Sequence, residues 1–65
     1  MDDVFKGQWM QLKGRVKSAW GKLTDDDVQQ IEGDFDKFVG VLQERYGWEK
    51  AEAEAQARKW YDTAA

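Results

Sequence analysis

The six glycines of this 65-residue chain form two triplets, and their spacing constrains the fold more than any other feature. They occupy positions 7, 14 and 21 and then 33, 40 and 47, so a shift of 26 residues superposes one triplet on the other. We interpret the chain as an internal duplication, because the same shift superposes apolar side chains on apolar side chains. The superposed pairs are Phe5 and Ile31, Trp9 and Phe35, Leu12 and Phe38, Val16 and Leu42, and Trp20 and Tyr46.

Each copy of the repeat has the apolar spacing of an amphipathic helix. Counted from Trp9 and from Phe35, large apolar side chains recur at i, i+3, i+7 and i+11, which places them on one buried stripe. Two copies are too few to stack into a solenoid, so we expect a pseudo-symmetric pair packed face to face.

Glycines and capping residues predict where the helices begin and end. Gly21 and Gly47 directly follow the last stripe residue, where a left-handed glycine commonly ends a helix. Thr24 precedes three aspartates and is a predicted N-cap, and Asp34 is a second one. The predicted fold is a single all-α domain over residues 1–65, with helices at about 3–20, 25–32, 34–46 and 49–62.

Gly14 and Gly40 lie in the middle of predicted helices, where each costs about 1 kcal/mol relative to alanine. Two interpretations stay open at this point. Either two helices approach closely at these positions, where a Cβ would prevent contact, or a ligand approaches the backbone there.

The stripes and the alanine-rich end of the chain predict the core. Its predicted members are Trp9, Leu12, Val16, Trp20, Leu23, Val28, Ile31, Phe35, Phe38, Leu42, Tyr46, Ala53, Ala57 and Trp60. Four more apolar residues have no predicted place, namely Phe5, Val41, Trp48 and Tyr61. If they gather on one exposed face, that face favours a protein partner or self-association.

Composition argues against enzyme chemistry. The chain has no cysteine and no histidine, and its single serine, Ser18, has no histidine to activate it. Asp25, Asp26 and Asp27 are neighbours that point in different directions on a helix, so we interpret them as capping residues rather than ion ligands. We therefore expect no catalytic residue, no metal site and no cofactor.

Charge is unevenly distributed along the chain, whose net charge is −3. Residues 1–23 carry five basic and two acidic side chains, whereas residues 24–36 carry six acidic side chains and no basic one. The candidate interaction surface is Lys6, Lys13, Lys17, Lys22 and Trp48. An alternative function is weak binding of anions or nucleic acid through the helical hairpins, although the net charge disfavours it.

Four sequence blocks resemble the CsbD family of small bacterial stress-response proteins. They are Trp9–Gly14, Gly21–Asp27, Ile31–Gly33 and Gln43–Gly47, and the resemblance extends over residues 6–61. It implies a four-helix fold of two α-hairpins packed across one another with approximate two-fold symmetry. It also implies expression raised under stress such as osmotic shock, starvation or stationary phase. Asp34, Phe35 and Val41 replace basic residues that are usual in this family.

These observations together give the expected function. No apolar run exceeds two residues, so we expect no membrane span. We expect a monomer, located by default in the cytoplasm, with an unknown protein as the possible partner and nucleic acid as an unfavoured one. The predicted function is that of a non-enzymatic stress-response protein that acts by protein interaction or protection.

Overall fold

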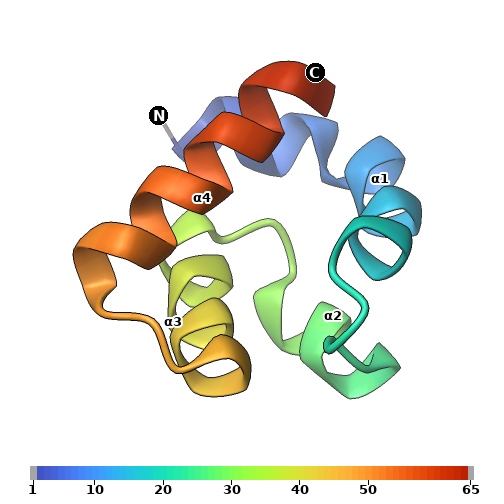
Figure 1. The fold of residues 1–65 in the computed structure, drawn as a ribbon. Coiled ribbons are helices and arrows are strands. Elements are labelled where there is room, and N and C mark those ends of the chain that lie inside the picture. Colours follow the sequence, from blue (N-terminus) through green and yellow to red (C-terminus); the bar gives the residue numbers. More distant parts are fainter. Residues whose placement is uncertain (1, 65) are drawn as a thin grey trace.

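The computed structural model describes the backbone of residues 2–64 and the side chains of residues 4–63. These residues form four helices and no strand: α1 (Asp2–Ala19), α2 (Asp25–Ile31), α3 (Phe35–Tyr46) and α4 (Lys50–Ala64) (Figure 1). The predicted all-α fold with four helices is confirmed. Each predicted boundary lies within two residues of the observed one.

Helix α3 is the central element, because it packs against each of the other three helices. Helices α1 and α2 contact one another, as do α3 and α4, so the hairpin partners lie side by side. The later turns of α4 lie near the start of α1 (Figure 1), where the Phe5 and Tyr61 ring centroids are 5.4 Å apart. The two-fold relation between the hairpins stays a prediction.

The core follows the predicted stripes and extends beyond them. Most of the predicted core is buried, while Trp9, Tyr46 and Trp60 are partly buried and pack against it. Phe5, Val39 and Val41 are also buried. The predicted stripe was too narrow because α3 has neighbours on several sides and buries side chains on both flanks of the stripe. The hypothetical exposed face of Phe5, Val41, Trp48 and Tyr61 is therefore wrong.

The repeat is broken in the second copy between α2 and α3. Gly7 lies within α1, whereas its counterpart Gly33 lies in a turn where Glu32 (φ 47°) and Gly33 (φ 80°) are both left-handed. Asp34 then begins α3 as predicted, accepting a hydrogen bond from the backbone N–H of Lys37 at 3.2 Å. A Cβ on Gly33 would lie 3.1 Å from the Lys6 Cα, so this turn packs directly on α1.

Among the other glycines with a predicted role, Gly47 behaves as predicted, whereas the predictions for Gly14, Gly21 and Gly40 are wrong. Gly47 is left-handed (φ 72°) and ends α3 as predicted. Gly21 does not have a positive φ, so its predicted role as a left-handed stop is wrong; the chain turns there through a hydrogen bond from Leu23 N–H to the Trp20 carbonyl. Close helix contact at Gly14 and Gly40 is also wrong, because a Cβ at either position would meet no atom within 4 Å.

Alanine substitutions at Gly33 and Gly40 should change stability in opposite directions. Gly33→Ala forces a left-handed alanine against the backbone of α1, so we expect the free energy of unfolding to fall by about 1–2 kcal/mol. Gly40→Ala adds a methyl group to open space in a helix and should raise it by about 0.5–1 kcal/mol. Urea denaturation of both variants measures these changes. If both substitutions change the free energy of unfolding in the same direction, the different structural roles given to Gly33 and Gly40 are wrong.

Candidate interaction surface

Aromatic side chains from both hairpin loops meet around Trp20, whose side chain is only 7% exposed. The centroid of its ring lies 5.8 Å from that of Tyr46 and 6.1 Å from those of Trp48 and Trp60, in edge-to-face geometry. We call the set Trp20, Lys22, Tyr46, Trp48 and Trp60 the loop-end cluster. Edge-to-face pairs at these separations are favourable arrangements of aromatic rings.

The outer part of the loop-end cluster is a stacked pair with a cation beside it. Tyr46 and Trp48 lie parallel, with centroids 4.7 Å apart and an interplanar angle of 19°. The left-handed Gly47 between them makes this return of the chain possible. The Lys22 ammonium lies 5.2 Å from the Tyr46 centroid, within the range of a cation–π contact. Tyr46, Trp48 and Trp60 are all half-buried, so part of each residue faces solvent.

Polar groups in the loop-end cluster are few. The backbone N–H of Lys22 donates to the Tyr46 hydroxyl at 3.5 Å, at the long limit for a hydrogen bond. The indole N–H of Trp20 is buried and finds no acceptor among the described residues. The cluster therefore offers a partner an apolar aromatic surface with one ammonium group at its edge.

Apart from this surface, an ion pair between a buried carboxylate and a partly exposed guanidinium connects α2 to α3. Asp27 is 2% exposed and accepts two hydrogen bonds from the Arg45 guanidinium, each 2.8 Å long. Its Oδ2 also accepts the backbone N–H of Thr24 at 3.0 Å, while the Thr24 hydroxyl accepts the Asp27 N–H at 3.2 Å. This capping box confirms Thr24 as the N-cap of α2.

The Arg45 guanidinium holds the pKa of Asp27 at about 2, below its ordinary value of 3.8, although burial of the carboxyl acts in the opposite direction. Donating these hydrogen bonds to the Asp27 carboxylate raises the pKa of Arg45. Both carboxylate oxygens of Asp27 are occupied by these bonds. Asp27 is thus suited to a structural role rather than to proton transfer.

The predicted interaction residues fall into two separate groups. Lys22 and Trp48 come together in the loop-end cluster, where each lies against Tyr46. Lys6, Lys13 and Lys17 are exposed on α1, and their spacing places them on one side of the helix together with Met10. We call Lys6, Met10, Lys13 and Lys17 the basic strip. At its end, the Lys17 ammonium lies 2.6 Å from an Asp25 oxygen, and both side chains are largely exposed.

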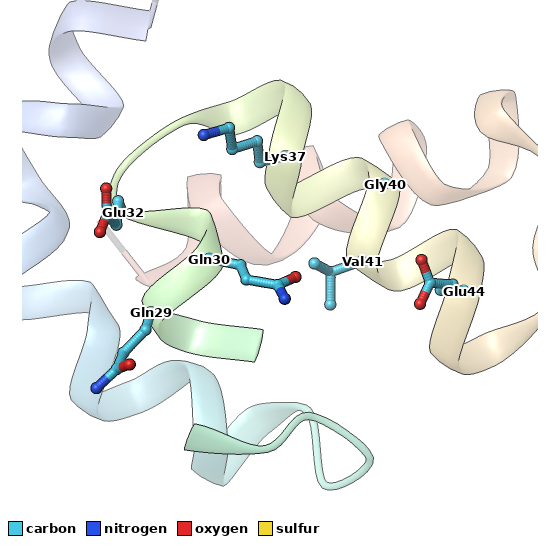
Figure 2. Close-up of a pocket in the computed structure, with 7 residues that line it drawn as sticks. All are labelled: Gln29, Gln30, Glu32, Lys37, Gly40, Val41 and Glu44. Atoms are coloured by element: carbon cyan, nitrogen blue, oxygen red, sulfur yellow. The ribbon is translucent and has the colours of Figure 1, made fainter. Parts of the chain in front are cut away.

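A groove of about 520 Å³ lies between α2 and α3 (Figure 2). Its lining residues are Gln29, Gln30, Glu32, Lys37, Gly40, Val41 and Glu44. Figure 2 shows the Gln30 side chain pointing from α2 toward Val41 on α3. Sequence reasoning missed this groove, although the open backbone at Gly40 had suggested that something could approach there.

The described residues provide neither a metal-binding cluster nor a membrane span. Over the described part of the chain, no group of three carboxylates is arranged to hold a metal ion. None of the helices there combines the length and the apolar character needed to cross a bilayer.

Comparison with known proteins places this arrangement in a family. The family model described as CsbD-like matches residues 3–59. The chain belongs to the CsbD-like family. This match confirms the family resemblance of the sequence blocks and assigns the chain to a family of general stress-response proteins.

Several relatives in the CsbD-like family are similar over nearly their whole length. The UPF0337 protein PA4738 of Pseudomonas aeruginosa is 53% identical over 60 residues, covering 92% of each chain. The UPF0337 protein ECA0631 of Pectobacterium atrosepticum is 53% identical over 60 residues, which are 92% of this chain and 87% of the relative. The UPF0337 protein YjbJ of Escherichia coli K12 is 56% identical over 58 residues, 89% of this chain and 84% of the relative. None of these names states an activity, a substrate or a partner.

Proposed function

We propose that this CsbD-like chain is a non-enzymatic stress-response protein that acts by binding other polypeptides through its loop-end cluster. The observation that carries the proposal is the stacked pair of Tyr46 and Trp48, which is partly exposed, as is Trp60. Aromatic side chains that remain accessible at one place are typical of protein-binding surfaces. We also propose a cytoplasmic location, with which the absence of cysteine is compatible.

The one buried carboxylate among the described side chains, that of Asp27, supports a binding role over a catalytic one. General acids and bases usually have a pKa shifted toward neutrality. Here the pKa of Asp27 moves away from neutrality, and its oxygens are fully engaged by Arg45 and Thr24.

The partner chemistry follows from the make-up of the loop-end cluster. An apolar segment of an unfolded polypeptide would cover the exposed faces of Trp48 and Tyr46, and the Lys22 ammonium would favour a nearby carboxylate. Such segments become accessible when other proteins unfold, which is a common consequence of stress.

This proposal is tested by diluting a chemically unfolded client protein, such as citrate synthase, at room temperature with and without the chain. We expect the chain to reduce light scattering from client aggregation, and Trp48→Ser to lose most of that effect because the stacked surface is removed. Circular dichroism at room temperature checks that the variant is folded under the conditions of the assay.

The matched control is Val4→Ser, which removes an exposed apolar side chain from the far part of α1. Serine and valine have similar helix propensities, so this variant should protect the client as well as the wild type. If Trp48→Ser protects as well as Val4→Ser, the loop-end cluster is not the binding surface. If the wild type has no effect at a molar excess over client, the protective function is wrong.

A further inference from the structure

The groove between α2 and α3 is lined in part by Gly40, a glycine in the middle of α3. Gly40 lies on the side of α3 that faces away from the core, and a Cβ there would meet nothing within 4 Å. A glycine in a helix interior destabilises the helix, and packing within the chain gives no reason for this one. The exposed backbone at Gly40 and the neighbouring Val41 side chain form the less polar part of the groove.

Carboxylates border this groove at both ends. Glu32 lies at the end of α2 and Glu44 lies one turn beyond Gly40 on α3 (Figure 2). Lys37 is the one basic side chain among the lining residues, so they carry a net negative charge. A complementary partner would bring positive charges spaced along its length and an apolar side chain between them.

The basic strip on α1 has this arrangement. Met10 is 75% exposed. Among the described residues, Met10 and Val4 are the large apolar ones that are exposed to solvent. Lys6 and Lys13 lie on either side of it along the helix, seven residues apart, or about 10 Å of helix rise. Methionine is flexible and fits irregular apolar hollows well.

We propose that the basic strip of one copy docks into the α2–α3 groove of a second copy, with Met10 over Gly40 and Val41. The charge distribution favours a second copy over a nucleic acid, because the acidic segment 24–36 attracts the basic α1 of another chain and repels phosphates. The surfaces that meet are different, so the contact is head-to-tail and leaves one strip and one groove free at the ends.

A head-to-tail contact of this size is weak and depends on salt. We expect monomers at low micromolar concentration and growing oligomers as the concentration approaches about 1 mM. Sedimentation velocity should show the average mass rising about twofold over that range at low salt. The rise should largely disappear in roughly 0.5 M NaCl, because exposed charges are then screened.

Gly40→Leu is the central variant, since it fills the groove without harming the fold. Leucine favours helix more than glycine does, and its Cβ has open space, so the variant should unfold at the same or a higher urea concentration than the wild type. It should nevertheless remain monomeric at all concentrations. The matched control is Ala55→Leu, which adds the same side chain to an exposed position on α4 and should associate like the wild type.

A mixing experiment separates a head-to-tail contact from other kinds of association. Lys13→Glu damages the strip and leaves the groove intact, whereas Gly40→Leu fills the groove and leaves the strip intact. Each variant alone should be monomeric. An equimolar mixture should form one-to-one pairs and nothing larger, because only one strip and one groove remain functional.

Three results would overturn the proposal. The first is association of Gly40→Leu that equals that of the wild type. The second is a strictly monomeric wild type at about 1 mM and low salt. The third is duplex DNA binding that Lys13→Glu weakens while the wild type does not self-associate, which would assign the basic strip to a polyanion.

Discussion

Phe38→Ala is expected to leave most of the chain unfolded at room temperature. The Phe38 side chain is fully buried on the central helix α3, and its ring lies within 6.3 Å of four others. The centroid distances are 5.7 Å to Trp60, 5.8 Å to Phe5, 5.9 Å to Trp20 and 6.3 Å to Phe35. Removing a buried phenylalanine ring costs about 3–5 kcal/mol, which is comparable with the whole stability of a domain of this size.

The measurement is far-UV circular dichroism of the variant followed by urea denaturation. Phe38→Leu keeps most of the buried volume and should stay folded with a loss of about 1–1.5 kcal/mol, so the series remains informative if the alanine variant cannot be purified. Val4→Ala is the surface control and should change stability by less than about 0.5 kcal/mol. A Phe38→Ala variant as stable as Val4→Ala would contradict the assignment of α3 as the centre of the core.

Local sequence patterns predicted the helices and much of the core. The stripe through Phe35, Phe38 and Leu42 is a property of one helix and its 3.6-residue period, so it can be read without knowing the neighbours. Thr24 and Asp34 were predictable for the same reason, since a cap acts within four residues. Features that depend only on adjacent residues were therefore accessible from the sequence.

Features that depend on the angles between helices were not accessible. Val39 and Val41 are buried because the other three helices all pack against α3. The apolar period within one helix does not reveal how many neighbours that helix has. The break near Gly33 was predicted from the capping residue Asp34, but the left-handed conformation of Glu32 and Gly33 that produces it, and the groove beside it, were not.

The candidate site was predictable only in part for the same reason. Lys22 and Trp48 were predicted as members of one interaction surface, but no local pattern indicated that Tyr46 would join them. The pairing of Asp27 with Arg45 also spans 18 residues. The position of Asp27 three residues after Thr24 suits a capping box, but that local pattern does not indicate its burial against Arg45 at the end of α3.

Asp27→Asn should lower the free energy of unfolding by about 2 kcal/mol near neutral pH. The asparagine oxygen can still accept the Thr24 N–H, but its amide cannot offer two anionic oxygens to the Arg45 guanidinium. Breaking a buried pair commonly costs 3–5 kcal/mol. We expect less here, because the Arg45 side chain is 42% exposed and can turn into water once its partner is lost. In a chain of this length the melting temperature should fall by roughly 8–16 °C.

Thr24→Ala is the matched control for the capping contribution. It removes the hydroxyl that accepts the Asp27 N–H and leaves the ion pair, so a loss of about 1 kcal/mol is expected. If Asp27→Asn costs no more than Thr24→Ala, the contact with Arg45 contributes nothing beyond the cap.

The pH dependence provides an independent measure of the same ion pair. Because the pKa of Asp27 is about 2 in the folded chain against a reference value of 3.8, the unfolded chain takes up this proton first as the pH falls. The stabilisation is therefore fully present above about pH 4 and is lost as the pH decreases toward 2, by about 2 kcal/mol in total. Asp27→Asn lacks this carboxyl, so the gap in stability between the wild type and the variant should narrow over the same interval. Urea denaturation of the wild type and of Asp27→Asn between pH 7 and pH 2 measures this difference in stability. A difference that stays constant with pH would show that the low pKa of Asp27 does not contribute to folding.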